Sequence, residues 1–267
     1  MAWQDRALAR QLLSNARKAL NQWLDAPDDR RSHALLVVGT PHGGTGALVA
    51  ALHGCEQVWT WGADAAAAFD GEHLRPPDVV EALLWATPAD AVVLEILGDV
   101  HLVDRVLEVH DGARAVWLVR PWREVAELAV AAQGDAALRA IQALADGTAE
   151  ETGALGVRVP EAVVEQVRAC RPADLSPAAG AALDWYVRTS FLYTLQLDTD
   201  PRVLVLPTPT VAADPVATLT RVLAHAGVST RQPLPALDLA PSPPSPAVEV
   251  GGDVAALCDA LWTRVVA

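Results

Sequence analysis

An apolar run followed by a glycine-rich segment constrains this chain more than any other feature of its sequence. The run Leu35–Val38 precedes a segment that carries four glycines (Gly39, Gly43, Gly44 and Gly46). An uninterrupted apolar run is typical of a parallel strand that is buried on both faces. The glycines allow a tight turn and a close approach of the backbone to a ligand. The stretch therefore predicts a buried strand, a tight turn and a helix that continues to about residue 53.

The start of that helix is a candidate anion site. The first N–H groups of a helix have no partner within the helix, and they lie at the positive end of its dipole, so they favour a phosphate group. We therefore predict that residues 39–47 bind a phosphate and that the rest of the fold is arranged around them. The alternative is a glycine-rich turn that binds no ligand.

The segment is not suited to a nucleoside triphosphate with magnesium. In the pattern G-x-x-x-x-G-K-[ST], the lysine neutralises the β- and γ-phosphates and the last residue binds Mg²⁺. Gly39 and Gly44 occupy the glycine positions, but Thr45 and Gly46 stand where the lysine and the Ser/Thr are expected. Lys18, the single lysine of the chain, lies upstream. The sequence thus predicts phosphate binding without the usual triphosphate machinery and without a metal.

Composition excludes several kinds of partner. The 267 residues are 52% hydrophobic and carry a net charge of −13, which is typical of a globular protein and unfavourable for nucleic acid or an anionic membrane. The three cysteines are scattered without metal-ligand spacing, which indicates a reducing compartment. No apolar run approaches the length of a membrane span, and no signal peptide is recognisable. We expect a cytoplasmic protein.

Four apolar runs predict a parallel sheet. They are separated by segments with helical periodicity, so the expected fold is α/β, with three layers in the order α/β/α and a P-loop-like phosphate-binding turn. Ligands of such folds bind at the carboxyl ends of the strands. A shorter strand is also possible over 57–61. The four predicted core strands are 34–39, 90–95, 115–120 and 202–206.

One domain is expected over 1–267, with helices between the strands. It would include an N-terminal helix within 1–30, a proline-rich tether over 232–247 and a C-terminal helix over 252–266. Ser176 followed by proline predicts the N-cap of a long helix. The helices predicted between the strands span 78–85, 101–109, 125–144 and 176–197.

The glycine-rich segment resembles the phosphosulfate-binding loop of sulfotransferases that use 3′-phosphoadenosine 5′-phosphosulfate (PAPS). Pro41, Gly44 and Thr45 match the family pattern of Pro, Arg or Lys, Ser, Gly, Thr, Thr. Three positions depart from it, with histidine for the basic residue, glycine for the serine and glycine for the second threonine (His42, Gly43 and Gly46).

A second match follows in residues 115–126. The family has a strand that ends in an arginine, which grips the 3′-phosphate of PAPS, and Arg120 lies at this place. A guanidinium group suits bidentate phosphate binding. The alternative is that Arg120 pairs with a surface carboxylate. The family's second 3′-phosphate ligand, a serine, is Leu128 here, so the resemblance implies only half of that clamp.

The resemblance also implies catalytic roles. His42, if protonated, would neutralise the leaving oxygen, and either Glu95 or His101 would accept the proton of the acceptor hydroxyl. Glu95 ends a strand as a Walker B carboxylate does, and we expect it to have a partner or a role. For His101 the alternative is a solvated histidine at a helix start. The implied cofactor-binding residues are Thr40, Pro41, His42, Gly43, Gly44, Thr45, Gly46, Ala47 and Arg120.

Three functions therefore compete. The first is transfer of a sulfuryl group from PAPS to a hydroxyl of a small-molecule acceptor. The second is a sulfotransferase-like binding or scaffold protein that has lost activity, since several family residues are replaced. The third, disfavoured by the missing lysine, is a P-loop nucleotide kinase that uses Glu95 as a metal partner.

Overall fold

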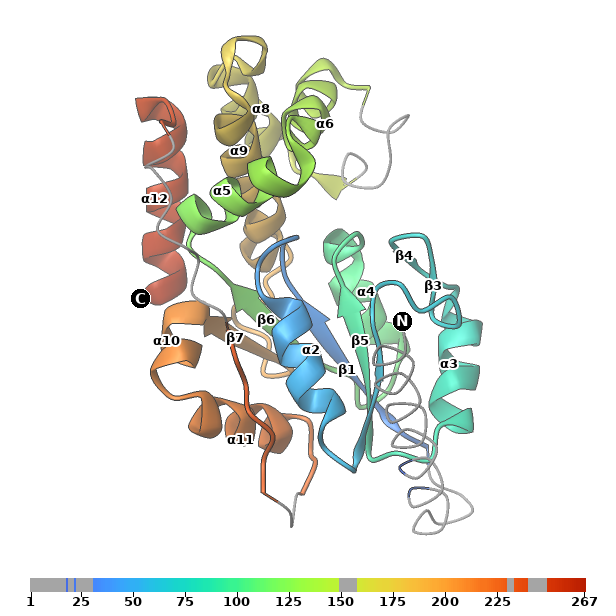
Figure 1. The fold of residues 1–267 in the computed structure, drawn as a ribbon. Helices are drawn as coiled ribbons and strands as arrows, with labels where there is room; N and C mark the ends of the chain where they lie inside the picture. Colours follow the sequence, from blue (N-terminus) through green and yellow to red (C-terminus); the bar gives the residue numbers. More distant parts are fainter. Residues whose placement is uncertain (1–17, 19–21, 23–30, 149–157, 230–232, 240–248) are drawn as a thin grey trace, which may run out of the picture.

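The chain is built around a five-stranded parallel sheet (Figure 1). The computed structural model describes residues 18, 22, 31–148, 158–229, 233–239 and 249–267. The strand order is β2-β5-β1-β6-β7, and every neighbouring pair is parallel. This confirms the predicted α/β class with a central parallel sheet. The strands are β1 (His33–Val38), β2 (Val58–Trp61), β5 (Ala91–Ile96), β6 (Arg114–Val119) and β7 (Val203–Pro207).

Helices cover both faces of the sheet, which gives three layers (Figure 1). Alternate residues of β1 enter different cores, because successive side chains of a strand point to opposite faces. Leu36 and Val38 pack with residues of α3, α4, α5, α6, α8, α9 and α12. Leu35 and Val37 pack with residues of α2, α10 and α11.

The helices have the following bounds. On the first face lie α3 (Pro77–Ala86), α4 (Val103–Val109), α5 (Trp122–Gln133), α6 (Ala136–Asp146), α8 (Glu161–Ala169), α9 (Pro177–Thr194) and α12 (Gly252–Val266). On the second face lie α2 (Thr45–His53), α10 (Thr208–Ala213) and α11 (Pro215–His225). Short 3₁₀ turns occur at η1 (Val100–Leu102) and η3 (Pro172–Asp174).

Two predicted helices differ from the structure. The helix expected over 125–144 is two helices, α5 and α6, because Gly134 adopts a left-handed φ of 63° between them. The helix expected over 101–109 begins as η1 and becomes α-helical only at Val103. The capping prediction is confirmed, since the hydroxyl of Ser176 accepts a hydrogen bond from the amide of Ala179 at 3.3 Å.

A small pair of strands and one helix were not predicted. Residues 63–76 contain a small antiparallel pair, β3 (Phe69–Asp70) with β4 (His73–Leu74), beside the N-terminus of α3. Helix α8 precedes the long helix α9 in the chain. Strands of two residues carry too little periodicity to be recognised in a sequence.

Two segments from outside the sheet contact opposite ends of helix α2. Most of 1–30 lies outside the described residues, but the Lys18 ammonium donates to the carbonyl of His53 at 2.5 Å, at the end of α2. Of the predicted tether 232–247, residues 233–239 are described, and they run without helix or strand. A β-carbon on Gly44 would lie 3.2 Å from Leu239. This segment therefore reaches the N-terminus of α2, and helix α12 covers 252–266.

No helix within the described parts of the chain is both long enough and hydrophobic enough to cross a lipid bilayer.

Candidate functional site

The glycine-rich segment lies at the centre of the sheet's carboxyl edge. It follows β1, whose neighbours on either side are β5 and β6. In the β1–β5 register Val38 pairs with Ile96, and in the β1–β6 register it pairs with Trp117. Residues that follow these three strands therefore meet at one edge.

The turn itself is held by few backbone hydrogen bonds. Gly39 N–H donates to the carbonyl of Ile96 at 3.4 Å, and Gly43 N–H donates to the carbonyl of Thr40 at 2.9 Å. Gly44 precedes α2 with a φ of 93°, which glycine adopts without steric cost. The chain thus enters α2 through a glycine in a left-handed conformation.

Several amides of the turn remain available to a ligand. The N–H groups of His42, Gly44, Thr45 and Gly46 donate to no acceptor among the described residues. These groups surround the N-terminus of α2, where the helix dipole favours negative charge. The local structure therefore has the properties that bind a phosphate or sulfate group.

The backbone of the turn explains one departure from the family pattern and shows strain at another. A β-carbon at Gly43 would lie 2.7 Å from the carbonyl oxygen of Thr40, so the family's serine does not fit this backbone. His42 itself has a φ of 63°, in the left-handed region that is unfavourable for residues other than glycine. Strained conformations of this kind occur often at ligand-binding turns.

The His42 side chain is partly enclosed and unpaired. Its Nε2 atom is buried and has no hydrogen-bond partner among the described residues. Burial lowers the pKa of His42, and the positive charge of Arg120 lowers that pKa further. In the free protein His42 is therefore neutral at pH 7, which differs from the protonated state that its predicted role requires.

Arg120 lies where the sequence placed it, immediately after β6 and beside the turn. It is 8% exposed, and its Nη1 donates to the carbonyl of His42 at 3.2 Å. Its Nε forms an ion pair of 3.1 Å with the carboxylate of Glu124, without hydrogen-bond geometry. The indole N–H of Trp185 donates to the Arg120 carbonyl at 2.9 Å and so fixes the backbone. Arg120 thus contacts both the glycine-rich turn and a carboxylate, which are the two environments considered for it.

Glu95 also reaches the turn. It lies on β5 on the face covered by α2, and it accepts a hydrogen bond from the Thr45 hydroxyl at 2.7 Å. The amide of Ala63 donates to the other carboxylate oxygen at 3.4 Å. Glu95 therefore has the partner that burial of a carboxylate requires. The same contact occupies the hydroxyl of Thr45, which was expected to bind the phosphate.

His101 is buried, so the alternative of a solvated histidine is wrong. It is 5% exposed, its Nδ1 has no partner among the described residues, and its ring centroid lies 6.1 Å from that of Phe191. Burial lowers the pKa of His101 despite the opposing effect of Asp99, so the imidazole is neutral. Phe191 belongs to the core on the α9 face, whereas Glu95 lies on the α2 face. The two candidate bases are therefore not brought together.

Two arginines that the sequence did not single out hold the segment after β5. Arg188 Nη1 donates to the carbonyl of Leu97 at 2.8 Å, and its Nε binds Asp184. Arg158 Nη1 donates to the carbonyl of His101 at 2.6 Å. In the sequence, Arg188 stands four residues after Asp184 on a predicted helix. This spacing indicates that the pair stabilises the helix, and it does not indicate a contact with the segment after β5.

No cluster of three or more His, Cys, Asp or Glu residues arranged to hold a metal ion occurs in the described part of the chain.

Solved structures show what this arrangement resembles. The chain matches the sulfotransferase domain of the olefin synthase from Synechococcus PCC 7002 with a TM-score of 0.51 and 12% identity, over 89% of this chain and 98% of that one. This chain has the sulfotransferase fold. At that identity the likeness concerns the fold alone.

Two further sulfotransferase-fold structures match less closely. A sulfotransferase from Alicyclobacillus acidocaldarius has a TM-score of 0.49 and 14% identity, over 89% of this chain and 93% of that one. Mouse sulfotransferase SULT7A1, complexed with PAP, has a TM-score of 0.38 and 14% identity, over 76% of this chain and 62% of that one. Both are too dissimilar to add to the assignment of the fold. No protein-family profile and no curated protein sequence matches the chain.

Proposed function

We propose that this protein is a sulfotransferase that moves a sulfuryl group from PAPS to a hydroxyl of a small-molecule acceptor. The observation that carries the proposal is the hydrogen bond from Arg120 to the carbonyl of His42. It joins a strand-end arginine to a turn with open amides, so two groups of the kind that suits phosphate lie at one sheet edge. A donor with phosphates at both its 3′ and 5′ positions requires two such groups.

The residues of the turn fit the donor's 5′ end. The open amides from His42 to Gly46 would bind the 5′-phosphate, and the helix N-terminus would favour its charge. Arg120 would bind the 3′-phosphate through its guanidinium group, in competition with Glu124. When bound, PAPS supplies an activated sulfuryl group. The full proposed binding set is Thr40, Pro41, His42, Gly43, Gly44, Thr45, Gly46, Ala47 and Arg120.

His42 would supply positive charge only when the donor is bound. Nearby phosphate charge raises the pKa of a histidine, which opposes the lowering by burial and by Arg120. A protonated Nε2 would then donate to the oxygen that leaves the sulfur. The Nε2 atom has no competing partner among the described residues.

The proton of the acceptor hydroxyl needs a base. As the acceptor oxygen bonds to sulfur and the sulfur–phosphate oxygen bond breaks, this proton passes either to Glu95 or to His101. Glu95 lies at the turn but is bonded to Thr45, and His101 is neutral with an unpaired Nδ1. In-line transfer of this kind depends mainly on positioning and charge stabilisation.

A binding or scaffold protein is the second candidate, and two contacts and one charge state favour it. Glu124 faces Arg120, Glu95 occupies the hydroxyl of Thr45, and His42 is uncharged in the free protein.

A P-loop kinase is disfavoured because no lysine lies in the turn. For the sulfotransferase we also propose a cytoplasmic location, since Cys55, Cys170 and Cys258 are free thiols.

Thermal denaturation in the presence of nucleotides tests the proposal. Adenosine 3′,5′-bisphosphate (PAP) at about one hundred times its dissociation constant should stabilise the fold by roughly 2.7 kcal/mol. ATP with Mg²⁺ should stabilise it less, and greater stabilisation by ATP·Mg would overturn the assignment. Incubation with PAPS and a panel of phenols and alcohols, with PAP release as the readout, then separates an active enzyme from a binding protein.

A further inference from the structure

Residues 97–101 connect the glycine-rich turn with His101, and we call them the β5–η1 segment. The residue before this segment, Ile96, accepts the hydrogen bond from Gly39 N–H at the start of the turn. At the other end, the His101 ring is buried, and its Nδ1 has no partner among the described residues. The place of this ring relative to the turn therefore depends on what holds the β5–η1 segment.

Two arginines hold the ends of the segment. Arg188, on α9, donates from Nη1 to the carbonyl of Leu97 at 2.8 Å. Arg158, which precedes α8, donates from Nη1 to the carbonyl of His101 at 2.6 Å. Hydrogen bonds from a charged donor are stronger than those between neutral groups. The first and last carbonyls of the segment are thus fixed by groups that lie far from it in the sequence.

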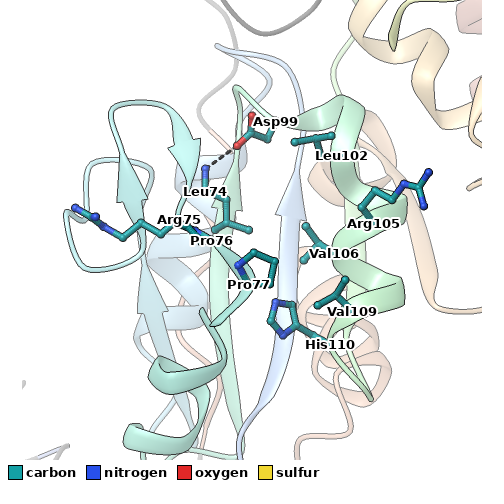
Figure 2. A pocket seen from close by; sticks show the side chains of 10 residues that line it. All are labelled: Leu74, Arg75, Pro76, Pro77, Asp99, Leu102, Arg105, Val106, Val109 and His110. Atoms are coloured by element: carbon teal, nitrogen blue, oxygen red, sulfur yellow. Dashed lines mark hydrogen bonds between the residues drawn. The ribbon is translucent and has the colours of Figure 1, made fainter. Parts of the chain in front are cut away.

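The middle of the segment contacts the β3–β4 hairpin. Asp99 accepts a hydrogen bond from the amide of Leu74 at 2.6 Å, which Figure 2 shows as a dashed line, and its other carboxylate oxygen lies 2.9 Å from Nδ1 of His73. A β-carbon on Gly98 would lie 2.5 Å from the carbonyl oxygen of Glu72, so the two backbones are in close contact. The hairpin therefore leaves the segment little freedom on this side.

Each arginine is in turn fixed by a carboxylate. Arg158 forms a bidentate pair with Asp104, with both distances at 2.7 Å, and the Arg188 Nε lies 2.8 Å from Asp184. The side chains of Arg158 and Arg188 are 26% and 13% exposed, so solvent screens these pairs only in part. A guanidinium group held in this way has a defined direction, and the carbonyl that it contacts is held with it.

Helix α9 also holds the proposed 3′-phosphate ligand. Trp185 donates to the carbonyl of Arg120, and it stands three residues before Arg188, on the same side of the helix. One helix therefore determines the place of Arg120 and of the segment that leads to His101.

The two candidate bases differ in their free valences. Both carboxylate oxygens of Glu95 are engaged, one by the Thr45 hydroxyl and the other by the amide of Ala63. His101 has a buried ring nitrogen without a partner among the described residues. A neutral imidazole takes up a proton at the nitrogen that carries the lone pair. These contacts favour His101 over Glu95 as the base.

We propose that Arg158 and Arg188 are positioning residues, which hold His101 where its ring accepts the proton of the acceptor hydroxyl. The inference rests on the proposed sulfuryl transfer and selects the base for it. As the acceptor oxygen bonds to sulfur and the bond from sulfur to the phosphate oxygen breaks, the proton passes to the neutral His101 ring. The arginines contact only the backbone and carboxylates of their own protein, so they act through His101.

The charges around His101 predict how a positioning role differs from a purely structural one. Burial lowers the pKa of His101, Asp99 opposes this effect, and the charges of Arg158, His73 and Arg188 lower the pKa further. A base must be unprotonated, so turnover should fall as pH decreases through the pKa of His101. Removal of the Arg158 charge should raise this pKa and move the acid limb of the pH profile to higher pH.

Arg158→Gln tests the proposal in the PAP-release assay, with the phenol or alcohol of the panel that gives the fastest turnover. We expect kcat to fall about ten- to a hundredfold, because a displaced base loses much of its effect. The acid limb should move to higher pH, and the dissociation constant for PAP, measured by calorimetry, should stay unchanged. Arg158→Lys keeps the charge without the planar fork, so kcat should fall while the acid limb stays in place.

Arg168→Gln is the matched control. Arg168 also donates to a carbonyl, that of Ala145, and pairs with a carboxylate, that of Glu161, but it lies on α8 outside the β5–η1 segment. Its substitution should change neither kcat nor the acid limb.

The outcomes separate this inference from the proposed function. An active wild type whose kcat and acid limb are unchanged in Arg158→Gln overturns the inference alone. Loss of PAP affinity in parallel with kcat also overturns it, because Arg158 would then be a structural residue. A wild type that releases no PAP with any acceptor overturns the proposed function and the role of His101 with it. If Arg158→Gln does not fold, Arg158→Lys decides, since an unchanged kcat in that variant contradicts the proposal.

Discussion

At the scale of single residues, His42 combines a strained backbone with an unpaired ring nitrogen at the proposed site. Its left-handed backbone directs the turn, its carbonyl accepts from Arg120, and its ring nitrogen lies buried without a partner among the described residues. Strain and an unpaired polar atom both cost stability, and they persist at binding sites because a ligand offsets them.

His42 should couple PAP binding to pH. The pKa of His42 lies below its usual value in the free protein, and bound phosphate raises it, so binding takes up a proton. By linkage, affinity for PAP should then fall as pH rises from 6 to 8. Calorimetric titrations across this range should show a steeper fall for the wild type than for His42→Ala, which corrects for titration of PAP itself. If the two slopes coincide, His42 carries no charge at the phosphate.

Turnover by variants of His42 is a second test of its proposed charge. His42→Lys should keep or raise turnover and move the alkaline limb of the pH profile upward, because lysine stays charged to higher pH. His42→Ala should abolish turnover with little loss of fold. Full turnover in His42→Ala would show that another group neutralises the leaving oxygen.

Arg120 and Glu124 should change PAP affinity in opposite directions. Arg120→Ala removes a charged hydrogen-bond donor to phosphate, so PAP binding should weaken by about 1.5–3 kcal/mol, or roughly ten- to a hundredfold. Glu124→Gln removes the carboxylate that competes for the guanidinium group, so binding should tighten. Arg123→Ala, on the surface beside Trp122, serves as the control. Unchanged affinity in Arg120→Ala, with loss of stability only, would make Arg120 a structural residue.

At the scale of elements, close packing of α6 on α9 depends on one glycine. A β-carbon on Gly180 would lie 2.5 Å from the α-carbon of Leu138, so the two backbones leave no room for a methyl group. The neighbouring alanines of α9 are buried as well, so this turn of the helix is made of small residues (Ala178, Ala179, Ala181 and Ala182). This contact positions α9, whose Trp185 and Arg188 hold Arg120 and the segment after β5.

Gly180→Ala should therefore destabilise the protein by about 1–3 kcal/mol, despite the better helix propensity of alanine, because the helices must move apart. Gly252→Ala is the matched control. Its β-carbon would meet nothing within 4 Å at the start of α12, so the substitution should be neutral or slightly stabilising. Urea denaturation measures both free energies of unfolding. Equal values for the two variants would contradict the close contact of α6 and α9.

At the scale of the whole molecule, partly or fully buried histidines contribute to the pH dependence of stability. Burial lowers the pKa of four histidines, namely His42, His53, His101 and His225. A lowered pKa means that the unfolded chain binds more protons than the folded protein once pH approaches the unperturbed value of about 6.5. Protonation therefore favours unfolding in this range.

The free energy of unfolding should fall as pH decreases from 7.5 to 5.5. Carboxylates with lowered pKa, such as Glu81, contribute to acid unfolding only at lower pH, so they do not account for this fall. Urea denaturation at a series of pH values measures the effect. His225→Gln should flatten the curve relative to the wild type, since it removes one of the titrating groups. A stability that is constant or rises between pH 7.5 and 5.5 would show that these histidines are not buried as described.

Much of the fold could be predicted because it depends on local patterns. Apolar runs marked the parallel strands, the glycines marked the turn after β1, and Ser176 before proline marked the start of α9. The strand order and the division of the 125–144 helix were not predicted, since sequence periodicity contains no information on which strands become neighbours. The positive φ of Gly134 likewise left no distinct signal in a helical pattern.

The sequence by itself determined the fold class and the places of the turn and of Arg120, because strand-forming runs and their carboxyl ends are local properties. Only the tertiary structure decided the partners of these residues. Pairing of Arg120 with Glu124, of Thr45 with Glu95 and of His110 with Glu81 each depends on how packed elements are brought together. Burial of a side chain, which sets the charge state of a histidine, likewise depends on every element packed around it, so the chemistry of this site follows from the fold.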